Sequence, residues 1–254
     1  MKQWSRRLPG IALILVLLLL WQFSVQFGWV RSPSVPSVTA SFEGLWQSIV
    51  NGRLPLALAD TLMRIFIGYG IAVVLAVALG ALMGMSRFVY YLLEPVTELL
   101  RPVPSAAYIP IAILLLGVGN EMKIAVIAIA CFFPVLLNTY GGVRSVDPIL
   151  TDTGRTFGYP PVQRLWRIIL PSALPEILTG MRVALGIALI VGIVAEMLAG
   201  NSGIGYFILD SQRVFRVQFV FAGIITLALV GYLLNFLFLR IEAYVLRWRA
   251  STST

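Results

Sequence analysis

A polar segment, residues 147–171, interrupts a chain that is otherwise made of long apolar runs. Its sequence is DPILTDTGRTFGYPPVQRLWRIILP, and the runs on both sides are long enough to cross a bilayer. A bilayer offers no water to exposed backbone groups, so such runs cross it as helices and the polar segment lies in water on one face. The sequence therefore predicts an all-α membrane protein with one large polar loop.

The composition agrees with a membrane protein. The 254 residues are 59% apolar and 12% charged, whereas soluble domains carry about a quarter charged residues. The net charge of +8 does not indicate a nucleic-acid surface, because the basic residues fall mostly at the ends of apolar runs. We predict the lipid bilayer as a partner and no nucleic acid.

The chain lacks the residues on which most catalytic and metal sites depend. It has no histidine, and its two lysines, Lys2 and Lys123, lie outside any GxxxxGK[ST] phosphate loop. Its single cysteine, Cys131, lies inside an apolar run and is interpreted as a core residue. We predict no catalytic, metal-binding or cofactor-binding residue in this chain, and no enzyme activity of its own.

Six apolar runs are predicted to span the membrane, at about residues 8–30, 61–84, 88–119, 124–143, 174–199 and 219–246. A signal peptide is the competing interpretation of the first run, but that run is long for one and no A-x-A-like cleavage site follows it. We divide the chain into a first span with an external loop (1–55, including a short surface helix at about 42–50), a core of five spans (56–249) and a short tail (250–254).

Basic residues predict the orientation, because they concentrate on the cytoplasmic side of membrane proteins. With both termini inside, the inner segments contain Lys2, Arg6, Arg7, Arg87, Arg144, Arg155, Arg164, Arg167, Arg240, Arg247 and Arg249. The outer segments contain only Arg31, Arg53, Lys123, Arg213 and Arg216. Arg64, Arg101 and Arg182 lie within or beside spans and are not assigned to a side. This excess places residues 147–171 in the cytoplasm.

Two spans carry a stripe of small residues on one face. The second span has Gly68, Ala72, Ala76, Gly80 and Gly84, and the fifth has Ala184, Ala188, Gly192, Ala195 and Ala199. Small side chains let helix backbones approach closely in lipid, so we favour tight helix packing. Lining of a narrow path is the alternative.

The third span contains the first candidate for a translocation path. Its RPVPSAAYIP segment has three prolines that one regular helix cannot hold, and broken backbone at membrane depth occurs against protein or a water-filled cavity. A kink at the membrane surface, with Arg101 extending to the headgroups, is the other interpretation. Ionisable residues beside the fifth span (Glu176, Arg182 and Glu196) are either site residues or paired and solvated. The predicted path residues are Arg101, Pro104, Tyr108, Arg182, Gly192 and Glu196.

The polar segment is predicted to form two short helices. Asp147 followed by Pro148 is typical of a helix start, and Gly158 suits a left-handed helix stop. A second helix is expected from about Pro160 until Pro171 ends it. Arginines with aromatic residues are typical of contact hot spots, although a hairpin lying on the bilayer surface is the alternative. The predicted contact residues are Asp152, Arg155, Thr156, Phe157, Gly158, Tyr159, Gln163, Arg164, Trp166, Arg167 and Pro171.

This segment resembles the cytoplasmic EAA loop of type I ABC importer permeases, whose pattern is E-A-A-x-x-x-G-x9-I-x-L-P. Gly158, Ile168, Leu170 and Pro171 stand at the expected spacing. The opening departs from the pattern, with Asp152 for Glu and Thr153-Gly154 for Ala-Ala. A glycine at this point should weaken the first helix by about 1 kcal/mol relative to alanine.

The resemblance extends over nearly the whole chain after about residue 56. The segments RPVPSAAYIPIAILLLGVGNEMKI, ACFFPVLLNTYGGV, LPSALPEILTGMRVALGIALIVGIVAEML and GIGYFILDSQRVFR are similar to the branch that handles nitrate, bicarbonate, sulfonates and taurine. The resemblance implies a multi-pass protein of the bacterial cytoplasmic membrane. Its implied partners are a second permease subunit, expected to be an identical copy, two ATP-binding subunits that hold ATP and Mg, and an external binding protein.

The substrate implied by the resemblance is a small anion, with Arg101 and Arg182 as candidate electrostatic helpers. An uncharged or aromatic molecule, such as a vitamin precursor, is the alternative within the same family. A self-powered transporter or channel would need coupling-ion residues deep in the membrane, whereas the acidic residues here cluster near span ends. An intramembrane enzyme is disfavoured by the lack of histidine and of a paired carboxylate motif.

Overall fold

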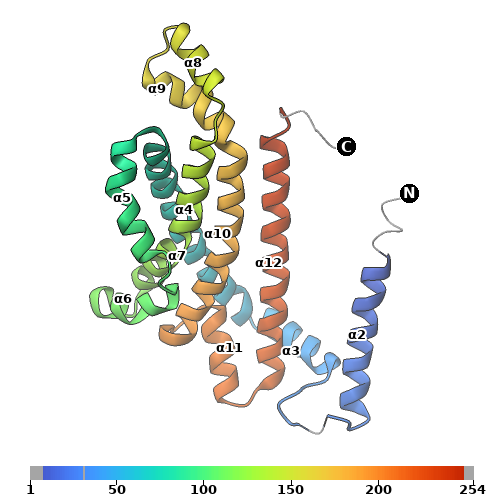
Figure 1. Cartoon of the computed structure of the whole chain (residues 1–254). Helices are drawn as coiled ribbons and strands as arrows, with labels where there is room; N and C mark the ends of the chain where they lie inside the picture. Colours follow the sequence, from blue (N-terminus) through green and yellow to red (C-terminus); the bar gives the residue numbers. More distant parts are fainter. Residues whose placement is uncertain (1–7, 31, 249–254) are drawn as a thin grey trace.

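The computed structural model describes residues 8–30 and 32–248, and every regular element within them is helical (Figure 1). Lys2, Arg6, Arg7, Arg31, Arg249 and the predicted tail 250–254 lie outside the described residues, so the predicted side of both termini stays a prediction. The elements are α2 (Leu8–Gln26), α3 (Val38–Val50), α4 (Arg53–Met85), α5 (Arg87–Leu100), η1 (Ser105–Ala107), α6 (Tyr108–Leu116), α7 (Asn120–Arg144), α8 (Pro148–Thr156), α9 (Pro161–Arg164), the π-helical turn η2 (Leu165–Ile169), α10 (Leu170–Ala199), α11 (Ile204–Arg213) and α12 (Val217–Val245).

Four helices in the described part of the chain are long and apolar enough to cross a membrane. They are α4, α7, the continuous run Pro161–Ala199 that ends as α10, and α12. The α5 and η1–α6 pair makes a fifth if it is counted as one span, bent by 82°. The predicted first span corresponds to α2, whose apolar stretch Ala12–Gln26 is shorter than the others. The sixth span therefore stays a prediction.

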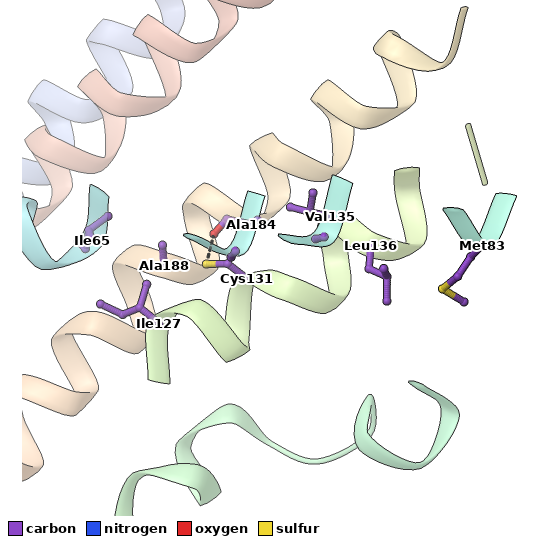
Figure 2. Close-up of a cluster of buried hydrophobic side chains, with 10 residues drawn as sticks. Ile65, Met83, Ile127, Cys131, Val135, Leu136, Ala184 and Ala188 are labelled. Atoms are coloured by element: carbon purple, nitrogen blue, oxygen red, sulfur yellow. Dashed lines mark hydrogen bonds between the residues drawn. The ribbon is translucent and has the colours of Figure 1, made fainter. Parts of the chain in front are cut away.

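The helices α4, α7 and α10 form the centre of the molecule, and their small residues explain why they pack so closely. A Cβ atom added to Gly68 would lie 2.8 Å from the carbonyl oxygen of Ile124, and one added to Gly80 would lie 2.8 Å from that of Leu136. Figure 2 shows the core between the three helices, where the Cys131 thiol donates a 3.3 Å hydrogen bond to the Ala184 carbonyl. Tight packing is thus confirmed for these stripes.

Gly68 and Gly70 provide a matched test of this packing. We expect Gly68→Leu to separate α4 from α7 and to abolish recovery of monodisperse protein in detergent, because the neighbouring carbonyl belongs to backbone and cannot move aside. Gly70→Leu should be recovered like the wild type, since nothing lies within 4 Å of a Cβ at that position. Size-exclusion chromatography after matched expression measures both; equal recovery of the two variants would contradict the packing.

The third span is broken where its prolines predicted a break. Regular helix ends at Leu100, residues 101–104 form the turn, and η1 and α6 continue at the 82° bend. Pro110 nevertheless lies inside α6. It is tolerated because it falls in the first turn, where backbone N–H groups have no partner within the helix.

The polar segment lies at one end of the molecule, and α3 and α11 lie at the opposite end (Figure 1). The prediction that Pro171 ends the second short helix was wrong, because helix continues from α9 through η2 into α10. The π-helical turn accounts for this continuity: the N–H of Leu170 bonds the carbonyl of Leu165, five residues back, just before the proline that has no N–H to donate.

Candidate functional site

A cavity of about 430 Å³ lies beside the break in the third span. Its walls come from the break and α6 (Arg101, Ser105, Tyr108), from the middle of α7 (Phe133, Asn138) and from α10 (Ile187). Arg101 and Tyr108 are path residues predicted from the sequence, and the predicted Pro104 lies in the turn that places them. Ser105, Asn138 and Ile187 could not be predicted, because nothing in the sequence shows which faces of α7 and α10 turn towards the break.

Arg101 is the only charged side chain that lines this cavity. Its guanidinium is more than half exposed, and the Glu98 carboxylate lies 3.9 Å away, so the pair is long and solvated. The Tyr108 hydroxyl donates a 3.4 Å hydrogen bond to the Leu100 carbonyl. The cavity therefore presents a positive charge together with the polar groups of a hydroxyl and an amide side chain.

The cavity adjoins a second one of about 400 Å³ that extends towards the α8–α9 end. Both are lined by Leu137 and Asn138, and the second also by Gly141, Ser145 and Glu176. One face of α7 therefore borders open space, from the break in the third span to the C-terminal end of α7. Glu176, singled out from the sequence as an ionisable residue beside the fifth span, lies on this face of the molecule.

Three of the predicted path residues, Arg182, Gly192 and Glu196, lie away from the cavity. Arg182 pairs with Glu242 of α12 at 3.4 Å, on another side of α10. Gly192 packs against Ile127 and Ile65, where a Cβ atom would meet their side chains at 3.2 and 3.3 Å. Arg182 and Gly192 thus lie apart from Arg101: Arg182 forms an ion pair, and Gly192 allows close helix packing.

Glu196 lies in a buried ion pair near the end where α3 and α11 lie. Its carboxylate accepts hydrogen bonds from the Arg64 guanidinium at 2.6 Å, from the Thr61 hydroxyl at 2.9 Å and from the Gly205 N–H at 3.0 Å. Arg64 and Glu196 have side chains only 3% and 1% exposed. We use the name Arg64–Glu196 cluster for Arg64, Glu196, Thr61, Gly205, Asn120 and Ser202.

The Arg64–Glu196 cluster joins four helices. Arg64 of α4 also donates to the Asn120 side-chain oxygen at the start of α7, at 2.8 Å, and to the Ser202 carbonyl before α11, at 3.0 Å. Gly203 has φ of +101°, and a side chain there would overlap the Glu196 carboxylate. The sequence alone does not assign Arg64 to a side of the membrane or to a partner. The available signal was an arginine inside an apolar span, which requires a partner.

The polar segment folds as a helical hairpin at its end of the molecule. The Asp147 carboxylate accepts a 2.8 Å hydrogen bond from the Ile149 N–H and Pro148 opens α8, as predicted. Gly158 has φ of +73°, and the Tyr159 N–H donates to the Gly154 carbonyl at 2.9 Å to close the turn. The predicted helix start and left-handed stop are therefore confirmed.

The hairpin exposes the aromatic residues expected to make contacts. The Phe157 and Trp166 side chains are largely exposed, and the Arg167 guanidinium lies over the Tyr159 ring. The other predicted contact residues are placed as follows: Asp152 pairs with Arg155 at 3.1 Å, Thr156 donates to the Asp152 carbonyl, Gln163 is half-buried in α9, Arg164 is half-buried with its Nε unpaired, and Pro171 lies in the first turn of α10.

Gly154 explains one departure from the EAA pattern. A Cβ atom at this position would lie 2.5 Å from the Cδ1 of Ile168 and 3.3 Å from the Cγ of Arg164. Glycine therefore allows α8 to approach η2 closely. The loss of helix propensity expected at this residue accompanies a closer contact between the two arms of the hairpin.

Long apolar helices, a broken span beside a cavity and a polar hairpin continuous with a core helix are the features of an all-helical membrane protein with open space inside its helix bundle. Residues 68–250 match the family described as binding-protein-dependent transport system inner membrane component, and the chain belongs to that family. Such chains are permease subunits of ABC importers, multi-pass proteins of the bacterial inner membrane.

Relatives with 31–36% identity cover most of the chain. A putative aliphatic sulfonates transport permease protein, SsuC of Bacillus subtilis, is 35% identical over 96% of this chain and 88% of its own length. The taurine transport system permease protein TauC of Escherichia coli is 36% identical over 74% of this chain and 69% of its own. The nitrate import permease protein NrtB of Synechocystis is 31% identical over 89% and 84%.

Solved structures share the fold. An inward-facing structure of the MetNI methionine ABC transporter matches with a TM-score of 0.68 at 18% identity, covering 77% of this chain and 97% of the matched chain. A crystal structure of an amino acid ABC transporter matches with a TM-score of 0.61 at 20% identity, covering 79% and 97%. At this identity the likeness concerns the fold alone.

Proposed function

We propose that this chain forms the translocation path of an ATP-driven importer for small anions of the sulfonate, taurine or nitrate type. The observation that carries the proposal is the cavity at the broken span, with Arg101 as its one charged lining residue. A positive charge beside hydroxyl and amide groups suits an anion with several acceptor oxygens. The named substrates of the relatives support the same class of solute.

We propose that ATP hydrolysis drives this chain through the α8–α9 hairpin, which faces the cytoplasm and contacts the ATP-binding subunits. The hairpin continues through η2 into α10, and α10 carries Glu176 and Ile187 at the two adjoining cavities. Movement of the hairpin is therefore transmitted along one helix to the path. Coupling of this kind requires that α10 can adopt two arrangements. The ATP-binding subunits and the solute must each bind one arrangement more tightly than the other.

The remaining proposed partners complete the path and deliver the solute. A second permease subunit, expected to be an identical copy, covers the open face of α7, and an external binding protein presents the solute at the α3–α11 end. ATP and Mg are held by the ATP-binding subunits. A self-powered carrier is disfavoured because Glu196 is committed to Arg64, Thr61 and Gly205 and does not line the cavity.

The role of Arg101 is tested by Arg101→Gln in the complete transporter. Charge-assisted hydrogen bonds contribute about 1.5–3 kcal/mol each, so we expect the rate of sulfonate uptake to fall about tenfold or more. Arg240→Gln is the matched control, because Arg240 lies over the Phe236 ring on the exposed surface of α12. Uptake of labelled sulfonate into proteoliposomes measures both variants; wild-type uptake by Arg101→Gln would refute the proposed site.

A further inference from the structure

A third cavity, of about 670 Å³, lies where the C-terminal ends of α4 and α7 meet the start of α5. It shares no lining residue with the two cavities beside the broken span. Because α7 ends only a few residues before α8 begins, this cavity lies towards the end of the molecule that carries the α8–α9 hairpin (Figure 1). The polar side chains that line it belong to Arg87, Tyr90, Tyr91, Glu94 and Arg144.

The cavity has an excess of positive charge. Two guanidinium groups, of Arg87 and Arg144, line it against the single carboxylate of Glu94. That carboxylate accepts a 2.5 Å hydrogen bond from the Tyr90 hydroxyl. Arg87 forms no ion pair or hydrogen bond with any residue in the described part of the chain. The cavity therefore suits an oxyanion with one negative charge, which a guanidinium binds through several hydrogen bonds.

Aromatic rings fix the position of the Arg144 guanidinium. Its central carbon lies 5.6 Å from the centroid of the Tyr90 ring and 5.8 Å from that of Tyr140. The two rings stack with their centroids 5.0 Å apart, and the Arg144 Nη1 donates a hydrogen bond to the Tyr140 hydroxyl. A guanidinium has five N–H donors, so others remain for a ligand. Because the side chain is already ordered, an anion binds there with little further loss of rotamer freedom.

The two exposed faces of α5 indicate that this cavity opens to an aqueous space. Phe88, Leu92 and Leu99 are largely exposed and lie on one apolar face, which suits lipid. A second face continues past the end of α5 and carries polar side chains at spacings of four and three residues: Arg87, Tyr91, Glu94, Glu98 and Arg101. Charged side chains at membrane depth lie against water or protein and not against hydrocarbon. The cavity lies on this polar face.

We propose that this cavity is a second anion site, which the solute occupies after it leaves Arg101 and before it enters the cytoplasm. The inference rests on the proposed function and adds a binding site to it, with Arg87 and Arg144 as the anion-binding residues. The two sites lie at opposite ends of the polar face of α5, with the carboxylates of Glu94 and Glu98 between them. Because like charges repel, the anion has two separate resting positions.

Equilibrium dialysis of labelled methanesulfonate against the permease–ATPase complex in phosphatidylcholine nanodiscs tests the inference, with empty nanodiscs subtracted. We expect two classes of site in the wild type. Arg101→Gln should remove one class, and Arg87→Gln should weaken the other about tenfold, the effect of losing one charge-assisted hydrogen bond. Arg247→Gln is the matched control and should bind like the wild type, because Arg247 is an exposed arginine over the Tyr244 ring that does not line the cavity.

Uptake by the complete transporter in proteoliposomes tests the place of this site on the path. In Arg87→Gln we expect the maximal uptake rate to fall about tenfold, since the anion leaving Arg101 passes two carboxylates with less attraction beyond them. The external concentration that gives half the maximal rate should stay unchanged, because the binding protein collects the solute. An unchanged maximal rate would overturn the transport role of the second site.

The binding outcomes separate this inference from the proposed function. A single class of site that needs Arg101 and ignores Arg87→Gln overturns the second site and leaves the Arg101 path intact. Wild-type binding and uptake by Arg101→Gln overturns the proposed function, and the exit role of the second site with it.

Lipid headgroups are the other ligands that basic pockets between membrane helices bind, so the dialysis is repeated in phosphatidylglycerol nanodiscs. Retention of both classes of site supports a soluble anion as the ligand. Loss of the Arg87-dependent class alone would show an anionic headgroup in the cavity and would overturn the inference.

Discussion

Replacing Glu196 with alanine is expected to destabilise the folded chain by about 3–5 kcal/mol, the cost of leaving one partner of a buried ion pair without the other. The Arg64 guanidinium, 3% exposed, would lose its 2.6 Å partner and keep Asn120, Ser202 and the half-exposed Asp60 carboxylate at 3.9 Å. Because the cluster joins α4, α7, α10 and the start of α11, the loss should loosen that whole end of the molecule. Thermal unfolding in detergent measures the change.

The matched control is Glu242→Ala, which removes the partner of Arg182 in a pair that is more exposed. We expect that change to cost less than about 1 kcal/mol. The double variant Arg64→Leu with Glu196→Leu should recover part of the stability lost in the Glu196→Ala variant, since neither member of the buried pair is left without the other. A Glu196→Ala variant as stable as Glu242→Ala would contradict the assigned role of the cluster.

Replacing Gly158 with valine is expected to disconnect the hairpin from the ATP-binding subunits while the spans remain folded. Gly158 has φ of +73°, a conformation that costs an L-residue about 1–2 kcal/mol. Nothing lies within 4 Å of a Cβ atom there, so the effect comes from backbone strain and not from a clash. We expect ATP-dependent uptake to fall roughly 5–30-fold, the population change that 1–2 kcal/mol produces.

Gly158→Asn is the matched control, because asparagine tolerates the left-handed conformation far better than a β-branched residue. It should retain most of the uptake and should co-purify with the ATP-binding subunit. Co-purification and uptake are measured on the same preparations. Wild-type behaviour of the valine variant in both measurements would refute the coupling role of the hairpin.

Local features of the fold were predictable from the sequence. The prolines after Arg101 predicted the broken third span, Asp147 and Pro148 predicted a helix start, and Gly158 predicted the left-handed stop. Each depends on the backbone geometry of one residue type, so a few consecutive residues are sufficient. The packing of the small-residue stripes was predictable for the same reason, since helical spacing alone puts those residues on one face.

Features that depend on how separate helices are rotated could not be predicted. Arg101 and Arg182 looked equivalent in the sequence, yet one lines the cavity and the other pairs with α12. Arg64 and Glu196 are 132 residues apart, and only the packing of α4 against α10 brings them together. The continuity through Pro171 was missed because a π-helical turn depends on how α9 and α10 meet.

We propose that this chain is a driven path that does not transport its solute alone. The most direct test is uptake of labelled hexane-1-sulfonate into proteoliposomes that contain this chain with or without its ATP-binding subunit and binding protein. We predict uptake only with both partners and ATP, and none from an ion gradient across liposomes that contain the chain alone. Gradient-driven uptake by the chain alone would contradict an ATP-driven mechanism.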